Sequence, residues 1–149
     1  MINLKKVFKE LIDDNTNIWI ITKGGIVIFS RVLSSFLEDQ MFGMLMTALN
    51  IFAQEVTSKS LANFELADQR FYLKEQDRIL FIVSCAKLEK KKKILRELDY
   101  IITKFFKKYP NFSEIWDGNV NKFADFEKTL KIKDEQSSKN LNLNFSTYF

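Results

Sequence analysis

Residues 17–30 read NIWIITKGGIVIFS, two apolar runs joined by the short polar stretch TKGG. A phosphate-binding loop of the Walker type requires a glycine before its lysine, a serine or threonine after it, and then a helix. Here the lysine precedes both glycines, and a second apolar run follows. Two glycines supply the positive φ angles of a two-residue turn. The stretch therefore predicts a β-hairpin, with strands at 17–22 and 26–30 that are covered on both faces.

The composition is typical of one globular domain. The chain has 149 residues, of which 46% are hydrophobic, including 15 phenylalanines. Only four glycines and one proline occur, which favours long regular elements. A single cysteine excludes an internal disulfide and predicts a reducing compartment. The sequence shows neither a signal peptide nor an apolar run of about 20 residues. We therefore expect a cytoplasmic protein, with peripheral membrane contact left open.

Apolar periodicity outlines the other elements. Spacings of three and four residues predict helices at 3–14, 37–57, 89–108 and 120–132, the last with Asn119 as its N-cap. Alternating or continuous apolar runs predict strands at 61–67, 70–74 and 79–85. Residues 133–149 are expected to form a flexible tail, or else a strand that pairs with a sheet edge.

The residues that most enzymes use are scarce. The chain has no histidine and one cysteine, which excludes Ser/His/Asp and Cys/His arrangements and zinc sites built on these residues. Asp117, Gly118 and Asn119 lack the regular ligand spacing of a calcium loop. We therefore predict no catalytic residue, no metal and no cofactor, and a protein that is not an enzyme.

The order of elements resembles the longin pattern of two strands, a helix, three strands and two helices. IWIITKGGIVIFSR at 18–31 is similar to the opening longin hairpin, and FGMLMTALNIFAQEV at 42–56 to its first helix. Residues 63–110 resemble the stretch of clathrin-adaptor small chains in which aromatic strands precede a helix ending in Phe and Tyr. The resemblance covers 17–132 and is strongest to small stand-alone longin proteins of archaea. The helix at 3–14 is extra, although the related roadblock domains also begin with a helix.

This resemblance implies an α+β fold, an α/β/α sandwich. Its five-stranded sheet is mixed or antiparallel in longin-like order, with one helix on one face and the others on the opposite face. The domain would cover residues 1–132, with 3–14 as an N-terminal extension. The implied function is a non-catalytic interaction module that serves small GTPases, adaptors or vesicle-trafficking partners at membranes. It would pair with another longin or roadblock subunit or with its own copy. The alternative is a roadblock- or profilin-like regulator of GTPases, motility or the cytoskeleton.

The helix at 37–57 suggests a partner surface. A projection at 100° per residue predicts the following inward stripe: Leu37, Met41, Leu45, Ala48, Leu49, Phe52 and Val56. The other side is small and amide-rich, and it includes a glycine that costs about 1 kcal/mol relative to alanine. We predict that it faces a partner through Phe42, Gly43, Met46, Thr47 and Asn50. The alternative is that Gly43 only eases packing within the domain.

One segment carries the basic charge. Residues 87–108 hold nine Lys or Arg and three Asp or Glu, within a chain of net charge +4. The helix predicted there begins at the run Lys90, Lys91, Lys92 and Lys93, where the helix dipole favours acidic residues instead. This run predicts contact with an acidic partner or an anionic membrane, and the alternative is a solvated patch. Nucleic acid is disfavoured, because the aromatic residues follow core spacing in helices.

Overall fold

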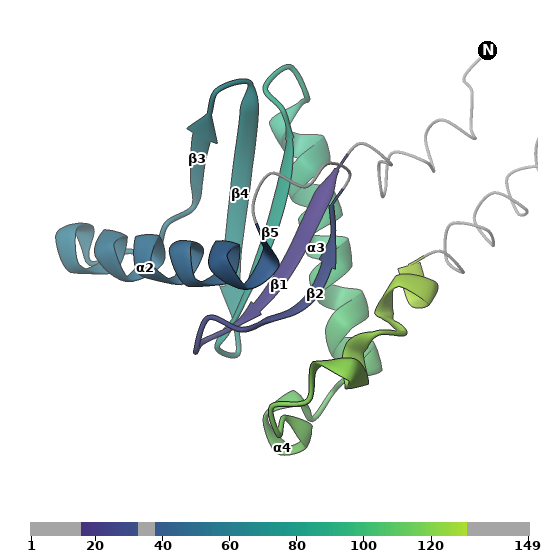
Figure 1. Ribbon diagram of the computed structural model, residues 1–149. Coiled ribbons are helices and arrows are strands. Elements are labelled where there is room, and N and C mark those ends of the chain that lie inside the picture. Colours follow the sequence, from purple (N-terminus) through teal and green to yellow (C-terminus); the bar gives the residue numbers. More distant parts are fainter. Residues whose placement is uncertain (1–15, 33–37, 131–149) are drawn as a thin grey trace, which may run out of the picture.

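The computed structural model describes residues 16–32 and 38–130. Its centre is a five-stranded antiparallel sheet in the order β2-β1-β5-β4-β3 (Figure 1). The strands are β1 (Asn17–Thr22), β2 (Val27–Arg31), β3 (Asn63–Leu66), β4 (Gln69–Gln76) and β5 (Ile79–Ala86). All five predicted strands are confirmed, although β3 is shorter and β4 longer than expected. The helix predicted at 3–14 and the tail at 133–149 lie outside the described residues.

The described helices cover both faces of the sheet. Helix α2 (Asp39–Thr57) lies on one face, whereas α3 (Lys91–Lys108) packs on the other (Figure 1). The short α4 (Phe112–Ile115) and the 3-10 helix η1 (Val120–Phe123) continue the α3 layer. The α+β sandwich with one helix opposite the others is thus confirmed. The sheet is antiparallel throughout.

Strand alternation divides the core into two layers. Ile18 and Ile20 of β1 belong to the cluster beneath α3, whereas Trp19 and Ile21 belong to the cluster beneath α2. Strand β5 alternates in the same way, and both central strands are buried over nearly their whole length. A period-two pattern of large apolar residues on both faces therefore creates two hydrophobic cores on one sheet.

The predicted stripe of α3 is confirmed. Ile94, Leu98, Ile101 and Phe105 are all buried. Phe105 is the centre of an aromatic cluster, with its ring 5.5 Å from that of Phe81 in the sheet. Helix α3 thus packs on the sheet through one narrow apolar arc, and lysines and other polar residues occupy the rest of its surface.

The chain after α3 differs from the helix predicted at 120–132. Residues 120–123 form a 3-10 helix, 124–125 a turn, and only 126–130 are helical in the described part. The expected cap is confirmed, because the Asn119 side chain accepts a hydrogen bond from the Asn121 backbone N–H at 3.0 Å. The tighter path brings Phe123 and Phe126 together into the aromatic cluster, with the Phe123 ring 4.9 Å from that of Tyr109. The short α4 was not predicted.

The first hairpin forms as predicted, but its turn is longer. Residues 23–26 connect the strands, and only Gly25 of the two glycines has a positive φ, 89°. The Thr22 backbone N–H donates to the Ile26 carbonyl at 2.9 Å, and the Ile26 N–H donates to Thr22 Oγ1 at 3.2 Å. The register also shifts between Ile20 and Ile21. The predicted two-residue turn was therefore wrong, because an irregular register requires a wider connection.

Candidate functional site

The orientation of α2 is set by a close contact with the first hairpin. The Phe42 ring stacks on Trp19 with 4.1 Å between centroids. A methyl group at Gly43 would place its carbon 2.8 Å from Val27 Cγ2 and still closer to the carbonyl oxygen of Gly25. Real side chains do not tolerate such distances. Gly43 therefore allows the helix backbone to rest on the hairpin loop, the alternative that the sequence had left open.

The predicted orientation of α2 was wrong. Phe42, Gly43, Met46 and Asn50 are buried, and Thr47 is half-buried. Asn50 is held in place because its Oδ1 accepts a hydrogen bond from the Leu61 backbone N–H at 2.9 Å. The physical reason is that the apolar arc of α2 exceeds half the circumference, so hydrophobicity alone does not select a face. Binding of a partner by α2 stays a prediction. The surface available for it is the opposite side of the helix.

That opposite side is a mainly apolar surface, which we call the open face of α2, with Glu55 as its one charged residue. Its apolar residues are Met41, Met44, Leu45, Ala48, Ile51, Phe52 and Val56. Its six large side chains are between 45% and 67% exposed. They account for six of the ten exposed large apolar side chains in the described part of the chain. Spacings of three and four residues place them on a single stripe, which is the arrangement by which amphipathic helices bind apolar surfaces.

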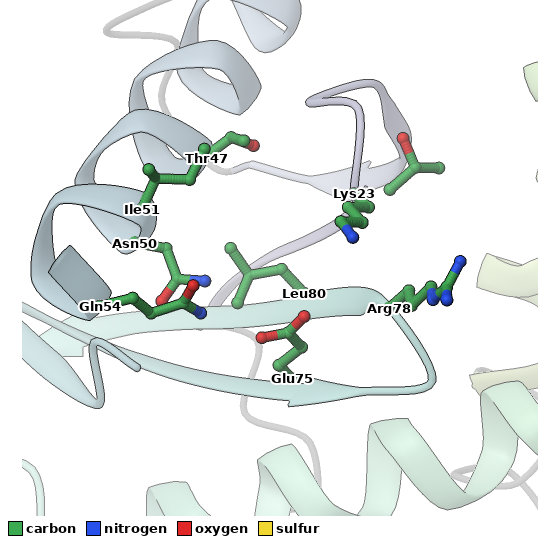
Figure 2. A pocket seen from close by; sticks show the side chains of 9 residues that line it. Lys23, Thr47, Asn50, Ile51, Gln54, Glu75, Arg78 and Leu80 are labelled. Carbon is green, nitrogen blue, oxygen red and sulfur yellow. The ribbon is translucent and has the colours of Figure 1, made fainter. Parts of the chain in front are cut away.

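A small pocket adjoins this helix, and we call it the polar pocket because most of the residues that line it are polar. It lies between α2, the loop of the first hairpin and the β4–β5 turn, with a volume of about 110 Å³ (Figure 2). The polar residues that line it are the following: Thr22, Lys23, Thr47, Asn50, Gln54, Glu75 and Arg78. Small-molecule sites typically enclose about 300–1,000 Å³. The pocket is therefore suited to polar side chains of a docked protein rather than to a whole nucleotide.

The predicted basic run lies at the start of α3. Lys90, Lys91 and Lys92 are exposed, and Lys93 is half-buried. Lys90 occupies the N-cap position without a side-chain cap, and the first turn of α3 contains no acidic residue. Lys93 Nζ lies 3.4 Å from a carboxylate oxygen of Glu89. We call residues 87–93, which form the connection between β5 and α3 and the first turn of α3, the basic tip.

An ion-pair network joins the basic tip to β3. Lys87 Nζ lies 3.1 Å from Glu65 Oε2, and Arg70 Nη2 lies 2.5 Å from Glu65 Oε1. The hydrogen bond from Arg70, followed by that from Lys87, lowers the pKa of the Glu65 carboxyl below its usual value. Among the described residues, no group of three or more His, Cys, Asp or Glu side chains is placed to hold a metal ion. None of the described helices has the length and apolar character needed to cross a membrane.

Sheet order, helix placement and a middle helix resting on the first hairpin define a longin-type domain. The family described as the first longin domain of FUZ, MON1 and HPS1 matches residues 16–108. That match runs from the start of β1 to the end of α3, more than half of the chain, and the chain belongs to this family.

Among solved structures, Myxococcus xanthus MglB is similar to this chain, with 16% identity and a TM-score of 0.49. The alignment covers 68% of this chain and 90% of that one. No curated protein matches the sequence.

Proposed function

We propose that the chain is a non-catalytic interaction module that pairs with a second copy of itself through the open face of α2. The observation that carries this proposal is the exposure of six large apolar side chains on one helix stripe. Burial of a side chain such as Leu, Ile, Phe or Met contributes about 1.5–3 kcal/mol. Monomeric proteins rarely expose so many large apolar side chains on one side of a helix. A partner that covers the stripe recovers this free energy.

The sequence of the stripe suits a twofold axis. In an antiparallel pair of α2 helices centred on Ala48, residues whose numbers sum to 96 lie opposite each other, so Met41 of one copy would lie near Glu55 of the other. Met44 would lie near Phe52, and Leu45 near Ile51. Large apolar residues thus face each other around the centre, the charged Glu55 lies toward the ends, and the small central alanine permits close approach of the two helices. A twofold interface must be self-complementary in this way.

Light scattering on the purified protein tests the pairing. We expect a concentration-dependent mass approaching two chains for the wild type and one chain for Phe52→Asp. Leu88→Asp is the matched control, because Leu88 is also an exposed apolar side chain but lies in the basic tip. That control should retain the mass of two chains. A wild-type mass of one chain at every concentration, or a paired Phe52→Asp variant, would contradict the proposal.

For the pair we propose the role of a platform for a small GTPase or a trafficking adaptor. Membership of the longin family supports this role, as does the resemblance described above. The polar pocket beside α2 adds Lys23 and Arg78, two basic side chains at the rim of the open face, with Glu75 between α2 and the turn (Figure 2). Such a rim can contribute polar contacts to a protein bound across the helices.

Capture of small GTPases from the same cell, loaded with GDP or a GTP analogue, tests this role. We expect nucleotide-dependent capture by the wild type and weaker capture by the double variant Lys23→Glu/Arg78→Glu. The control Lys59→Glu/Lys107→Glu makes the same change in net charge outside the pocket. Capture in neither nucleotide state would contradict the GTPase role, while the mass measurement would still decide the pairing.

A further inference from the structure

We propose that the basic tip docks on an anionic lipid bilayer, with Leu88 inserted among the acyl chains and the lysines bound to the headgroups. Leu88 is 97% exposed, the highest exposure of any large apolar side chain in the described part of the chain. It lies two residues after the end of the buried strand β5 and precedes a helix that packs on the sheet. The fold therefore places this leucine in water, although two cores lie nearby.

Hydrogen bonds hold the leucine in this position. The Glu89 backbone N–H donates to the Ala86 carbonyl at 3.1 Å, which closes a turn with Lys87 and Leu88 at its centre. The Lys87 N–H donates to the Asp68 carbonyl at 3.1 Å, which ties the tip to the β3–β4 turn. Leu88 is therefore presented by a defined turn, so little backbone ordering is needed when it enters a bilayer.

The charge around Leu88 is concentrated. The seven residues 87–93 contain five lysines and one glutamate, so their net charge equals the +4 of the entire chain. Lys87 pairs with Glu65 and Lys93 with Glu89. Lys90, Lys91 and Lys92 are exposed and make no ion pair with a described residue. Three adjacent lysines at the start of a helix are unfavourable for folding, since the helix dipole is positive there.

An apolar tip ringed by cations matches the layers of an anionic bilayer. Lysines near such a surface gain attraction from the headgroups, and an apolar side chain gains from the hydrocarbon below them. A nucleic acid offers phosphates but no apolar layer below them. The tip also lies at one end of the sheet, beside the β3–β4 turn, whereas the open face of α2 lies over one face (Figure 1). Membrane docking thus leaves α2 accessible to its partner.

Sedimentation with lipid vesicles tests the proposal. The wild-type protein should bind vesicles containing phosphatidylserine, should not bind pure phosphatidylcholine vesicles, and should be released by salt. Each lysine near an anionic surface contributes about fivefold to partitioning, so Lys91→Glu/Lys92→Glu should weaken binding at least about 25-fold. The control Lys59→Glu/Lys107→Glu, with the same net charge, should bind within about twofold of the wild type.

The leucine has its own test. Leu88→Ser should weaken vesicle binding about tenfold or more, since it removes the inserted side chain. Ile115→Ser, at an exposed apolar position of α4, is the matched control and should have no effect. The absence of binding to phosphatidylserine vesicles at low salt would overturn the proposal. Undiminished binding by Leu88→Ser, or complete competition by inorganic phosphate at matched ionic strength, would also overturn it, because either result points to a soluble anion site.

Discussion

Helices α2 and α3 pack on opposite faces of the same sheet, yet they depart from ideal helices in opposite ways. The N-terminus of α2 is well capped, because the Glu38 carboxylate accepts hydrogen bonds from the backbone N–H groups of Gln40 and Met41, both at 3.1 Å. Its outer side is apolar. The outer side of α3 is polar and rich in lysine, but its N-terminus has lysines in place of a cap.

Each helix therefore has one feature that is unfavourable for the stability of the single chain and that folding does not require. On α2 this feature is exposed apolar surface, and on α3 it is clustered charge at the wrong end of a helix dipole. Because the two features are chemically different, they point to different partners. Apolar surface is best covered by protein, and clustered lysines above an exposed leucine are best matched by an anionic bilayer.

The largest contrast concerns two phenylalanines. Phe105→Ala in α3 should lower the free energy of unfolding by about 3–5 kcal/mol, because Phe105 is fully buried in the aromatic cluster. Phe52→Ala in α2 should change it by no more than about 0.5 kcal/mol, since Phe52 is exposed in the single chain. Urea titration at protein concentrations too low for pairing measures both values. Equal losses would mean that α2 buries its open face within one chain.

The glycine contact of α2 gives the next largest effect. Gly43→Ala should lower stability by about 1–2 kcal/mol, since overpacking against the hairpin loop outweighs the better helix propensity of alanine. Gly24→Ala is the control, because the nearest atom to its added methyl group is 4.0 Å away. That variant should be neutral or slightly stabilised in the same titration. A stable Gly43→Ala protein would contradict the close approach of α2 to Gly25.

A smaller effect with the opposite sign is expected at the start of α3. Lys91→Glu should raise stability by about 0.3–1 kcal/mol, because an acidic side chain interacts favourably with the helix N-terminus. Lys107→Glu in the last turn should lower stability by a similar amount. Thermal unfolding monitored by circular dichroism distinguishes the two. If Lys91→Glu were destabilised, its loss of vesicle binding could not be separated from damage to the fold.

The smallest effect concerns acid pH. The pKa of Glu65 is lowered in the folded chain, so its contribution to stability is present above the unfolded pKa of about 4.3. This contribution is lost as the pH falls through the lower folded value. Wild type and Glu65→Gln should therefore differ at neutral pH and converge in strong acid. A difference in stability that stays constant as the pH falls would show that the Glu65 ion pairs do not contribute.

Local sequence patterns predicted the strands and α3 correctly because the pattern of apolar residues in each of these elements is compatible with only one buried side or one alternation. The apolar residues of α3 occupy a narrow arc, and those of β1 and β5 alternate between two cores. The orientation predicted for α2 was wrong because its apolar residues cover more than half of the helix circumference, so periodicity alone does not select the inward side. Which side of α2 faces the sheet is decided by the close approach of Gly43 to Gly25. These two residues are too far apart in the sequence for a local pattern to predict their contact.

The basic tip shows a second limit of sequence patterns. The run of lysines was evident, but Leu88 was not recognised as exposed. A single leucine between an apolar strand and an amphipathic helix is typical of a core residue. Only the turn closed by the Glu89 to Ala86 hydrogen bond shows that Leu88 points into solvent.

The open face of α2 contains its own reporters. Met41 and Met44 are exposed on it, whereas Met46 is fully buried two residues further along the same helix. Initial rates of peroxide oxidation, followed residue by residue by mass spectrometry, can be compared at low and high protein concentration. We expect Met41 and Met44 to react quickly in dilute solution and to become protected as the chains pair, with Met46 slow throughout. Equal oxidation of Met41 and Met44 at every concentration would contradict pairing through α2.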